Sequence, residues 1–413
     1  MPQSVVLPRV LVCFSSIRWN FLYQRPQHLL TRFAAEGVQV IYIESKVPVE
    51  ATNASFEKEV FQNVQVIRPL MPRDLTDAEY IARMQALLEE LLGPGKGEDA
   101  IFWYYNPAAI RYTAHLSPEL TVYDCIGDPE ALPNAHEDIS RLERQLMDRA
   151  DVVFTPSNTV QKSRRKYNMN IHVLPSAVDR EHFAQARCTE ENGPEDQRTI
   201  PHPRLGFYGM INENIDTKLL KQVATLRSDW HFVFIGPVME GCEAVLPEGD
   251  NIHYLGTKSY QDLPHYLCGW DLALVPLKED SQTKRILPAK VPEYLAAGVR
   301  VLATPLEEIV TTYGRKGLVQ VISGSEVFVN VAQSLLEDSG KEKASWLRQV
   351  DAELSGNSWD KVYQQMQEQL LLALQQKRPA RKKSLRTVGT ALVHIFRETT
   401  SLMKLPGTKA PGA

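Results

Sequence analysis

Short apolar runs alternate with amphipathic stretches along almost the whole chain, and this alternation limits the possible folds more than any other feature. Seven runs in the first part are rich in Val, Ile and aromatic residues and are bounded by turn residues, which is typical of buried strands: 9–14, 38–45, 64–70, 100–106, 120–126, 151–157 and 171–176. Helical patterns lie between many of them, at 26–36, 77–92, 136–149 and 158–167. This order predicts a parallel sheet with helices on both faces.

The alternation stops once and then begins again. Residues 188–203, "CTEENGPEDQRTIPHP", are polar and acidic and contain Gly and Pro, so they predict a linker or surface loop. Six further strands are predicted at 204–210, 230–238, 251–256, 272–277, 300–306 and 318–323, with helices at 216–226, 261–267, 289–297 and 325–336. The sequence therefore predicts two α/β halves, followed by a last helical segment at 358–376.

Composition narrows the function classes. A chain of 413 residues exceeds one ordinary core, and 43% hydrophobic with 23% charged residues is typical of a soluble globular protein. A net charge of −4 gives no reason to expect nucleic-acid binding. The five cysteines form no CxxC pair, which argues against structural zinc and disulfides and favours the cytoplasm. No apolar run approaches the ~18 residues that a membrane span needs.

The segment "RWNFLYQRPQHLL", residues 18–30, follows the first predicted strand at its carboxyl end. Doubly wound sheets bind ligands outside the carboxyl ends of their strands, and two such domains place the default site in the cleft between them. We therefore expect Trp19, Arg25 and His28 on the first-domain side of a cleft, where an acceptor would bind. The alternative is that these side chains only anchor a long loop.

The most specific text is "LPAKVPEYLAAGVRVLATPLEE", residues 287–308. Pro288 is suited to begin a helix, whose amino end would attract a phosphate. Lys290 lies in the first turn and Glu293 one turn later, on a similar face. A cation for a diphosphate and a carboxylate for vicinal sugar hydroxyls form a coherent pair. A solvated, capped helix face is the alternative.

This donor-type segment resembles that of glycosyltransferases with two Rossmann-like domains, the GT-B fold, in which a Glu at the position of Glu293 contacts the donor nucleoside. "LPSAVDREHF" is similar to their interdomain segment. "YQRPQHL" and "FYGMINENID" resemble a bacterial subgroup that builds surface polysaccharides, including teichuronic-acid-type enzymes. "SWDKVYQQM" is similar to their crossover helix. The resemblance implies an acceptor domain at 1–175, a linker at 176–203, a nucleotide-sugar domain at 204–356 and a crossover helix at 357–376.

The donor site departs from the family pattern. Arg285 stands where retaining members carry a second Glu, and "GMINENID" replaces the usual Arg-x4-Lys phosphate clamp. Gly209 still allows a phosphate to approach the backbone, and Asp216 can cap the following helix. The remaining candidate cations are Lys284, Arg285, Lys290 and Lys218. The stereochemical outcome of transfer stays open.

The first half is expected to supply the base that takes the acceptor proton. "TVYDCIGDPEAL" places Asp124 and Asp128 at a strand end, and related sugar transferases carry an Asp in a similar setting. Asp128 is the predicted base and Asp124 the alternative; a helix cap is the other interpretation of Asp128. No pattern suggests a catalytic metal, so cations and helix dipoles would stabilise the departing diphosphate. No cofactor is expected beyond the nucleotide sugar itself.

The end of the chain differs from the rest of the sequence in its charge pattern. Residues 377–386, "KRPARKKSLR", hold six basic residues and no acid, and an apolar stripe at helical spacing follows, which makes 377–404 a candidate for binding an anionic membrane surface. A disordered solubilising tail is the alternative. The sequence as a whole favours a cytoplasmic, peripheral glycosyltransferase that acts on a surface or exopolysaccharide precursor, and we expect this precursor to be lipid-linked. A nucleotide-sugar epimerase of the same build and a catalytically silent sugar-nucleotide-binding protein stay open.

Overall fold

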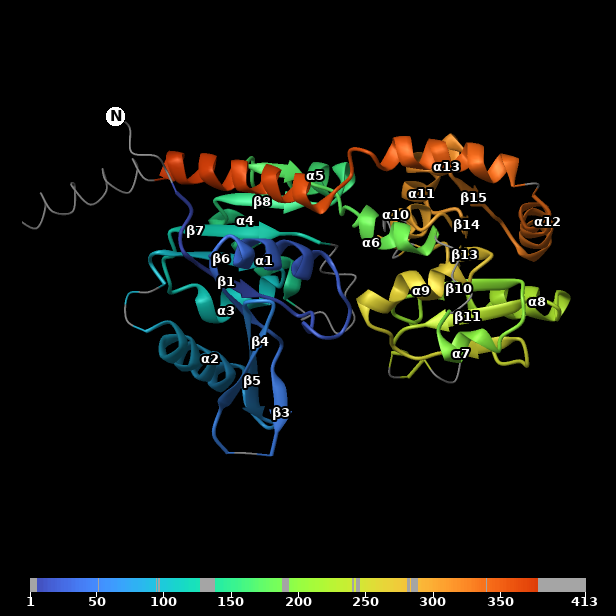
Figure 1. The fold of residues 1–413 in the computed structure, drawn as a ribbon. Helices are drawn as coiled ribbons and strands as arrows, with labels where there is room; N and C mark the ends of the chain where they lie inside the picture. The colour runs from blue at the N-terminus through green and yellow to red at the C-terminus, as the bar shows by residue number, and fades with distance from the viewer. Residues whose placement is uncertain are drawn as a thin grey trace, which may run out of the picture.

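The computed structural model contains two parallel β-sheets side by side, each flanked by helices (Figure 1). It describes residues 6–50, 52–93, 95, 97–126, 138–187, 193–239, 241–242, 246–280, 283, 289–338 and 340–377. One sheet is built from residues before 174 and the other from residues after 203. Two α/β halves are what the repeated alternation of strands and helices predicts.

The first sheet has the order β3-β5-β2-β1-β6-β7-β8-β9, with β4 paired to β5 outside this path. All seven predicted runs form strands. The strands are β1 (Val10–Phe14), β2 (Gln39–Ile43), β3 (Val47–Val49), β4 (Ser55–Phe61), β5 (Val64–Pro72), β6 (Ala100–Tyr104), β7 (Leu120–Asp124), β8 (Val152–Thr155) and β9 (Ile171–Val173).

One part of this sheet departs from the expected all-parallel arrangement. The periodicity did not predict β3 or β4, and β4 pairs antiparallel with β5. The reason lies in burial, because β4 has exposed Glu57, Lys58 and Glu59 in a row and lacks the apolar run of a covered strand. The hairpin extends away from the main body of the sheet as an arm (Figure 1).

Helices cover both faces of the first sheet. The helix α1 (Arg25–Ala35) packs on one face through Leu29, Leu30 and Phe33. On the other face lie α2 (Asp77–Leu92), η1 (Pro107–Ala109), α3 (Ile110–Thr113), α4 (Ile139–Arg149) and α5 (Asn158–Arg164). The predicted helix at 77–92 has the predicted bounds, whereas α5 ends three residues earlier than the pattern suggested.

The second sheet is parallel throughout, with the order β12-β11-β10-β13-β14-β15. Its strands are β10 (Arg204–Tyr208), β11 (His231–Ile235), β12 (Ile252–Tyr254), β13 (Leu272–Val275), β14 (Arg300–Ala303) and β15 (Val319–Val321). Its helices are α8 (Thr217–Leu226), η5 (Tyr260–Asp262), α9 (Leu263–Cys268), α10 (Lys290–Ala296), α11 (Glu307–Thr312), η6 (Gly314–Lys316), α12 (Ser325–Leu336) and α13 (Lys341–Leu354).

The connection between the sheets is more ordered than the linker composition suggested. It contains α6 (Arg180–Ala184), η3 (Gln185–Arg187) and α7 (Glu195–Arg198). Val178, Phe183 and Ile200 are buried in the hydrophobic core of the second domain. Residues 193–203 therefore pack on that domain, and polar side chains among them form hydrogen bonds with it. Asp196, for example, accepts hydrogen bonds from Lys258 and Tyr266.

The last described helix, residues 359–377, leaves the second domain and lies along the first (Figure 1). One face of this helix is apolar and packs in the same core cluster as α1. The buried residues of this face include Trp359, Tyr363, Met366 and Leu370. Lys377, the last described residue of this helix, donates a hydrogen bond of 2.6 Å to Asp151. Among the described helices, none is long and apolar enough to cross a membrane.

Candidate active site

A cavity of about 960 Å³ lies between the two domains. Its wall includes segments that follow the carboxyl ends of strands in both sheets: residues 19–26 after β1, Ser176 after β9, Gly209 after β10 and Gly236 after β11. Such a position is where doubly wound sheets bind ligands, and the volume falls within the usual range of ligand pockets. Of the predicted site residues, Trp19, Arg25, His28, Gly209, Lys290 and Glu293 line this cavity.

The residues after β10 and β11 are glycines whose positive φ angles are rarely adopted by L side chains. Gly209 has φ +139°, and a Cβ at this position would lie 2.1 Å from Cε of Lys290. Gly236 has φ +138°, and its Cβ would lie 1.9 Å from the carbonyl oxygen of Gly209. The aliphatic part of Lys290 therefore occupies the space above Gly209, which the sequence analysis had assigned to a phosphate.

Lys290 makes no hydrogen bond or ion pair with any residue that the structure describes. Its ammonium group lies 5.5 Å from the centre of the Phe207 ring, at the cavity wall. Burial lowers the pKa of Lys290, and the nearby Glu293 opposes that shift. A cation with so little protein compensation is suited to an anionic ligand.

Glu293 lies on the same helix and faces the same cavity. The Tyr208 hydroxyl donates a short hydrogen bond to Oε2 of this carboxylate. Burial raises the pKa of Glu293 to about 7, although the Tyr208 hydrogen bond and the charge of Lys290 both act to lower it. The carboxylate is thus poorly solvated, and hydroxyl groups of a ligand would supply the missing donors.

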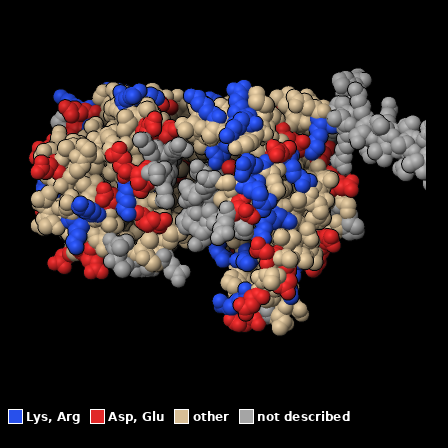
Figure 2. Space-filling view, turned by 180° about the vertical axis from the view of Figure 1, so that it is seen from behind, with Lys and Arg blue, Asp and Glu red and all other residues tan. Residues whose placement is uncertain are grey.

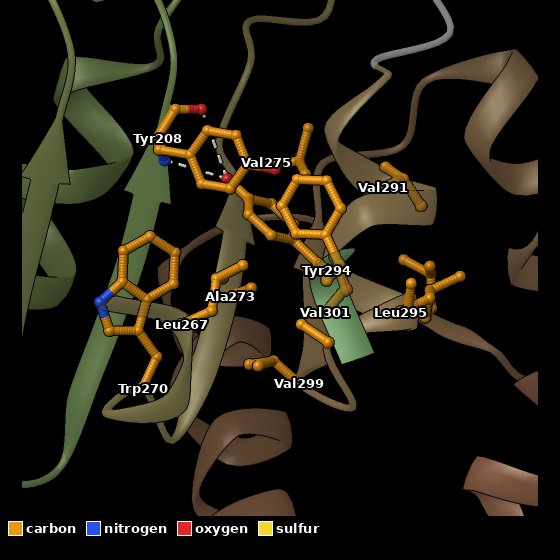
Figure 3. Packing of buried hydrophobic residues seen from close by; sticks show 14 of the residues in the cluster. Tyr208, Leu267, Trp270, Ala273, Val275, Val291, Tyr294, Leu295, Val299 and Val301 are labelled. Atoms are coloured by element: carbon orange, nitrogen blue, oxygen red, sulfur yellow. Dashed lines mark hydrogen bonds between the residues drawn. The ribbon is translucent and has the colours of Figure 1, made fainter. Parts of the chain in front are cut away.

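A dense aromatic and aliphatic core holds this wall in place (Figure 3). The Tyr294 hydroxyl accepts a hydrogen bond of 3.0 Å from the backbone N–H of Tyr208. The two rings meet edge to face, with centroids 5.0 Å apart, and Trp270 packs beside them. Because α10 is tied to the end of β10 in this way, the positions of Glu293 and Tyr208 are fixed relative to each other.

The first-domain side of the cavity contains a buried ion pair. Nε of Arg25 donates to both carboxylate oxygens of Asp124 at 3.1 and 2.9 Å, and Nη1 donates to the carbonyl oxygen of Leu174 at 2.9 Å. Asp124 is 0% exposed and Arg25 is 5% exposed. Asp124 is the alternative candidate for the acceptor base, and its carboxylate is enclosed and bound to the Arg25 guanidinium.

The remaining first-domain candidates serve packing as well as lining the cavity. Trp19 is 6% exposed, its ring meets Tyr42 edge to face, and its backbone N–H donates to Oε1 of Glu44 at 2.7 Å. His28 stacks on Trp359 with centroids 4.4 Å apart. Burial, followed by the charge of Arg32, lowers the pKa of His28 well below its usual value. His28 is therefore neutral at physiological pH.

Several predicted residues lie elsewhere. Asp128 and Arg285 fall outside the described residues, as do Lys284 and the tail beyond Lys377. Lys218 is exposed on α8 and is not among the residues that line the cavity. Asp216 caps α8 as predicted, since its side chain accepts from the N–H of Leu219 at 2.9 Å.

Three tyrosines also line the cavity: Tyr23, which lies in the segment expected at the cleft, and Tyr208 and Tyr260, which no sequence pattern singled out. Tyr208 ends β10 directly before Gly209, so the rule that strand ends carry function could have found it. Tyr23 and Tyr260 stack on each other across the domain boundary, with centroids 4.6 Å apart. No local pattern relates these two residues, which are far apart in the sequence. Among the described residues, no group of His, Cys, Asp or Glu side chains is arranged to hold a metal ion.

Comparison with solved structures gives the fold. Sucrose-phosphate synthase from Thermosynechococcus elongatus superposes with a TM-score of 0.64 at 13% identity, covering 87% of this chain and 97% of that one. This chain has the GT-B fold. Anabaena Alr3699/HepE, solved with UDP and glucose, is another GT-B neighbour, with a TM-score of 0.62 at 13% identity over 88% and 99% of the two chains.

Sequence comparison adds the activity class. Residues 202–338 match the family described as Glycosyl transferases group 1, so the match covers most of the second GT-B domain. A putative teichuronic acid biosynthesis glycosyltransferase, TuaH of Bacillus subtilis (strain 168), is 24% identical over 376 residues, which cover 82% of this chain and 91% of the relative. The resemblance to GT-B glycosyltransferases is confirmed, and glycosyl transfer is the activity class that these relatives support.

Proposed function

We propose that this protein transfers a sugar from a nucleotide-sugar donor to a cell-surface or exopolysaccharide precursor. The main support for a nucleotide-sugar donor is the part of the cavity wall that contains Lys290 and Glu293. Both face the interdomain cavity, and Lys290 has no ion-pair partner among the described residues. A diphosphate would compensate the cation, and a vicinal diol would donate hydrogen bonds to the carboxylate.

The acceptor part rests on the first domain. Asp128 is the proposed base for the acceptor hydroxyl, since Asp124 is held by Arg25. Lys290 is the proposed group that stabilises the departing diphosphate, which would make the reaction independent of a metal. No cofactor beyond the nucleotide sugar takes part in this scheme. The name of the TuaH relative refers to teichuronic acid, which supports a surface polysaccharide as the product class.

Cytoplasmic localisation and a lipid-linked acceptor at the membrane are further parts of the proposal. Residues 377–386 hold six basic residues, and Lys and Arg also gather on the back of the first domain (Figure 2). The exposed faces of α4 and α5 and the turn after them contribute Arg141, Arg144, Arg149, Lys162, Arg165 and Lys166. Basic residues near an anionic bilayer each contribute about 1 kcal/mol to binding.

Calorimetric titration with a panel of UDP-, GDP-, dTDP- and ADP-hexoses, combined with initial rates, tests the proposal. We expect Glu293→Ala and Lys290→Ala to weaken donor binding by roughly ten- to a hundredfold, because each loses a charge-assisted hydrogen bond of about 1.5–3 kcal/mol. Lys221→Ala, an exposed lysine on α8, is the matched control and should bind the donor normally. Normal affinity in Glu293→Ala would contradict the donor site.

The same assay separates binding from chemistry. Asp128→Asn keeps the side-chain shape but cannot accept a proton, so turnover should fall by about 10²–10⁴ while donor affinity is preserved. An unchanged rate would remove Asp128 from the mechanism. Product analysis also distinguishes the other hypotheses, because an epimerase would return an altered donor without an acceptor and a silent protein would return the donor unchanged.

A further inference from the structure

A cavity of about 380 Å³ lies on the first domain, apart from the interdomain cavity, and its volume falls within the range of ligand pockets. It follows the free edge of the first sheet, where α5 packs on one face of β9 and the last helix, residues 359–377, packs on the other (Figure 1). We call this cavity the edge groove. It is lined by Asn158, Gln161, Ile171, His172, Val173, Leu174, Gln365, Glu368 and Gln369.

Several side chains of the edge groove have hydrogen-bonding groups that the protein does not use. The carboxamides of Asn158, Gln365 and Gln369 have no hydrogen-bond partner in the part of the chain that the structure describes. Nε2 of His172 forms a hydrogen bond of 2.8 Å with Oδ1 of Asn170, and burial lowers the pKa of His172. The imidazole is therefore neutral at physiological pH, and its Nδ1 remains an acceptor because Nε2 donates to an amide oxygen.

The floor of the edge groove is the outer edge of β9. The N–H of Leu174 donates to the carbonyl oxygen of Thr155 in β8, so the alternation of the ladder directs the N–H and C=O of Val173 away from β8. The outer carbonyl of Ile171 is occupied, because Nε2 of Gln161 donates to it at 2.9 Å. A strand added to this edge would need the same carbonyl, so the groove is poorly suited to an extended peptide.

The chemistry of the lining indicates the class of ligand. None of the lining residues is Lys or Arg, and Glu368 is the one acid among them, so a phosphate would meet no cation there. Among the described residues, no cluster of His, Cys, Asp or Glu is arranged to hold a metal ion. Carboxamide, imidazole and backbone groups offer donors and acceptors side by side, which suits sugar hydroxyls, because each hydroxyl both donates and accepts.

The edge groove is adjacent to the interdomain cavity along three segments of the chain. The segment after β8 lines the interdomain cavity at Pro156 and the edge groove at Asn158, and the segment after β9 reaches the interdomain cavity at Ser176. The last helix lines the interdomain cavity at Trp359 and the edge groove at Gln365. These two residues are about 9 Å apart along the helix axis. A chain of sugars could therefore contact both places on the first domain.

We propose that the edge groove is a second carbohydrate-binding site, which holds a sugar unit of the acceptor chain at a distance from the end that receives the new sugar. This inference rests on the proposed function, because it takes the acceptor to be a glycan. Two contacts on one chain bind it more tightly than either contact alone. The groove would thus favour longer acceptors without touching the reacting atoms.

Two double variants of the last helix separate the groove from the rest of the protein. Gln365→Ala/Gln369→Ala removes two carboxamides from the edge groove and leaves the lining of the interdomain cavity unchanged. Gln364→Ala/Gln375→Ala is the matched control, because it removes two exposed glutamines of the same helix that do not line the groove. Both variants should melt at the wild-type temperature, since none of the four side chains has a hydrogen-bond partner among the described residues.

The probes are fragments of the surface polysaccharide of the cell that makes this protein, separated by length from one sugar unit upward. Initial rates with the preferred donor give KM for each length, and saturation-transfer NMR measures binding without a donor. We expect the wild-type KM to fall with length, and Gln365→Ala/Gln369→Ala to raise the KM of long fragments roughly three- to thirtyfold, the effect of one or two neutral hydrogen bonds. Donor affinity, kcat and the KM of the one-unit fragment should not change.

A KM for long fragments that is the same in Gln365→Ala/Gln369→Ala and in the control would overturn the inference. A wild-type KM that does not depend on length would also overturn it, as would an equal loss with the one-unit fragment. A wild type that binds no nucleotide sugar would refute the proposed function itself. The NMR titration would then still test the groove, because long fragments must bind the wild type and the control more tightly than the groove variant.

Discussion

Each wall of the cavity carries one cation and one carboxylate, and the two pairs are used differently. In the first domain, Arg25 and Asp124 share two hydrogen bonds and are almost completely enclosed. In the second domain, Lys290 and Glu293 face the cavity without an ion pair between them, and Glu293 is held by a tyrosine. The charges of Arg25 and Asp124 neutralise each other inside the protein, whereas the charges of Lys290 and Glu293 remain available to a ligand.

This difference shows that the residue types alone do not identify a binding site. A buried charge that has its partner is part of the architecture, and its removal exposes the partner's charge to a poorly polar environment. A charge that lacks a protein partner destabilises the ligand-free protein and is compensated when a ligand binds. Stability and affinity should therefore respond in opposite ways on the two walls.

The largest expected effect is on the stability of the first wall. Arg25→Met or Asp124→Asn leaves one charged or polar partner buried and uncompensated, so the free energy of unfolding should fall by about 3–5 kcal/mol. Urea denaturation measures this change. The double variant Arg25→Met/Asp124→Leu should recover part of the loss. If Asp124→Asn were fully stable but inactive, Asp124 would be a catalytic base after all, and the comparison of the two walls would fail.

A smaller, pH-dependent effect of opposite sign is expected on the second wall. The folded pKa of Glu293, about 7, lies above its ordinary value, so the stability that the protonated carboxyl contributes is fully present at low pH and is lost as the pH rises toward 7. Glu293→Gln does not titrate and should be more stable than the wild type above pH 7, by on the order of 1–3 kcal/mol.

Thermal unfolding of the ligand-free proteins from pH 5 to pH 8 measures this difference. The two stability curves should approach each other at the acidic end and separate at the alkaline end. Parallel curves across the whole range would mean that Glu293 is compensated inside the protein. Glu293 would then resemble Asp124, and the two walls would no longer differ in whether the protein compensates their charges.

The smallest effect on the fold is expected from the end of the chain. Deleting residues 378–413 keeps Lys377 and its hydrogen bond to Asp151, so the melting temperature and donor affinity should not change. Binding to anionic vesicles at moderate salt should be lost, since most of the basic run is removed. If the truncated protein still binds the vesicles, the basic faces of α4 and α5 are the better candidate for the contact, which Lys162→Glu with Lys166→Glu would test.

Local patterns predicted most of the regular structure. Strands that are buried on both faces, such as β6 and β13, have uninterrupted apolar sequences, because every side chain meets a helix or a neighbouring strand. The half-covered β4 has no such sequence, and it was missed for that reason. The helix α2, which begins at a capping box of reciprocal Thr76 and Glu79 bonds, was predicted with the right bounds.

The sequence by itself determined the two α/β halves, the resemblance to GT-B glycosyltransferases, and the positions of Lys290 and Glu293 on one helical face. These properties depend on hydrophobic periodicity and residue spacing within short segments, which can be read directly from the sequence. Only the tertiary structure decided which charges are compensated. Asp124 meets Arg25, and Tyr260 meets Tyr23, through contacts between residues distant in the chain. No local pattern encodes such pairings, because each depends on how separate elements pack together.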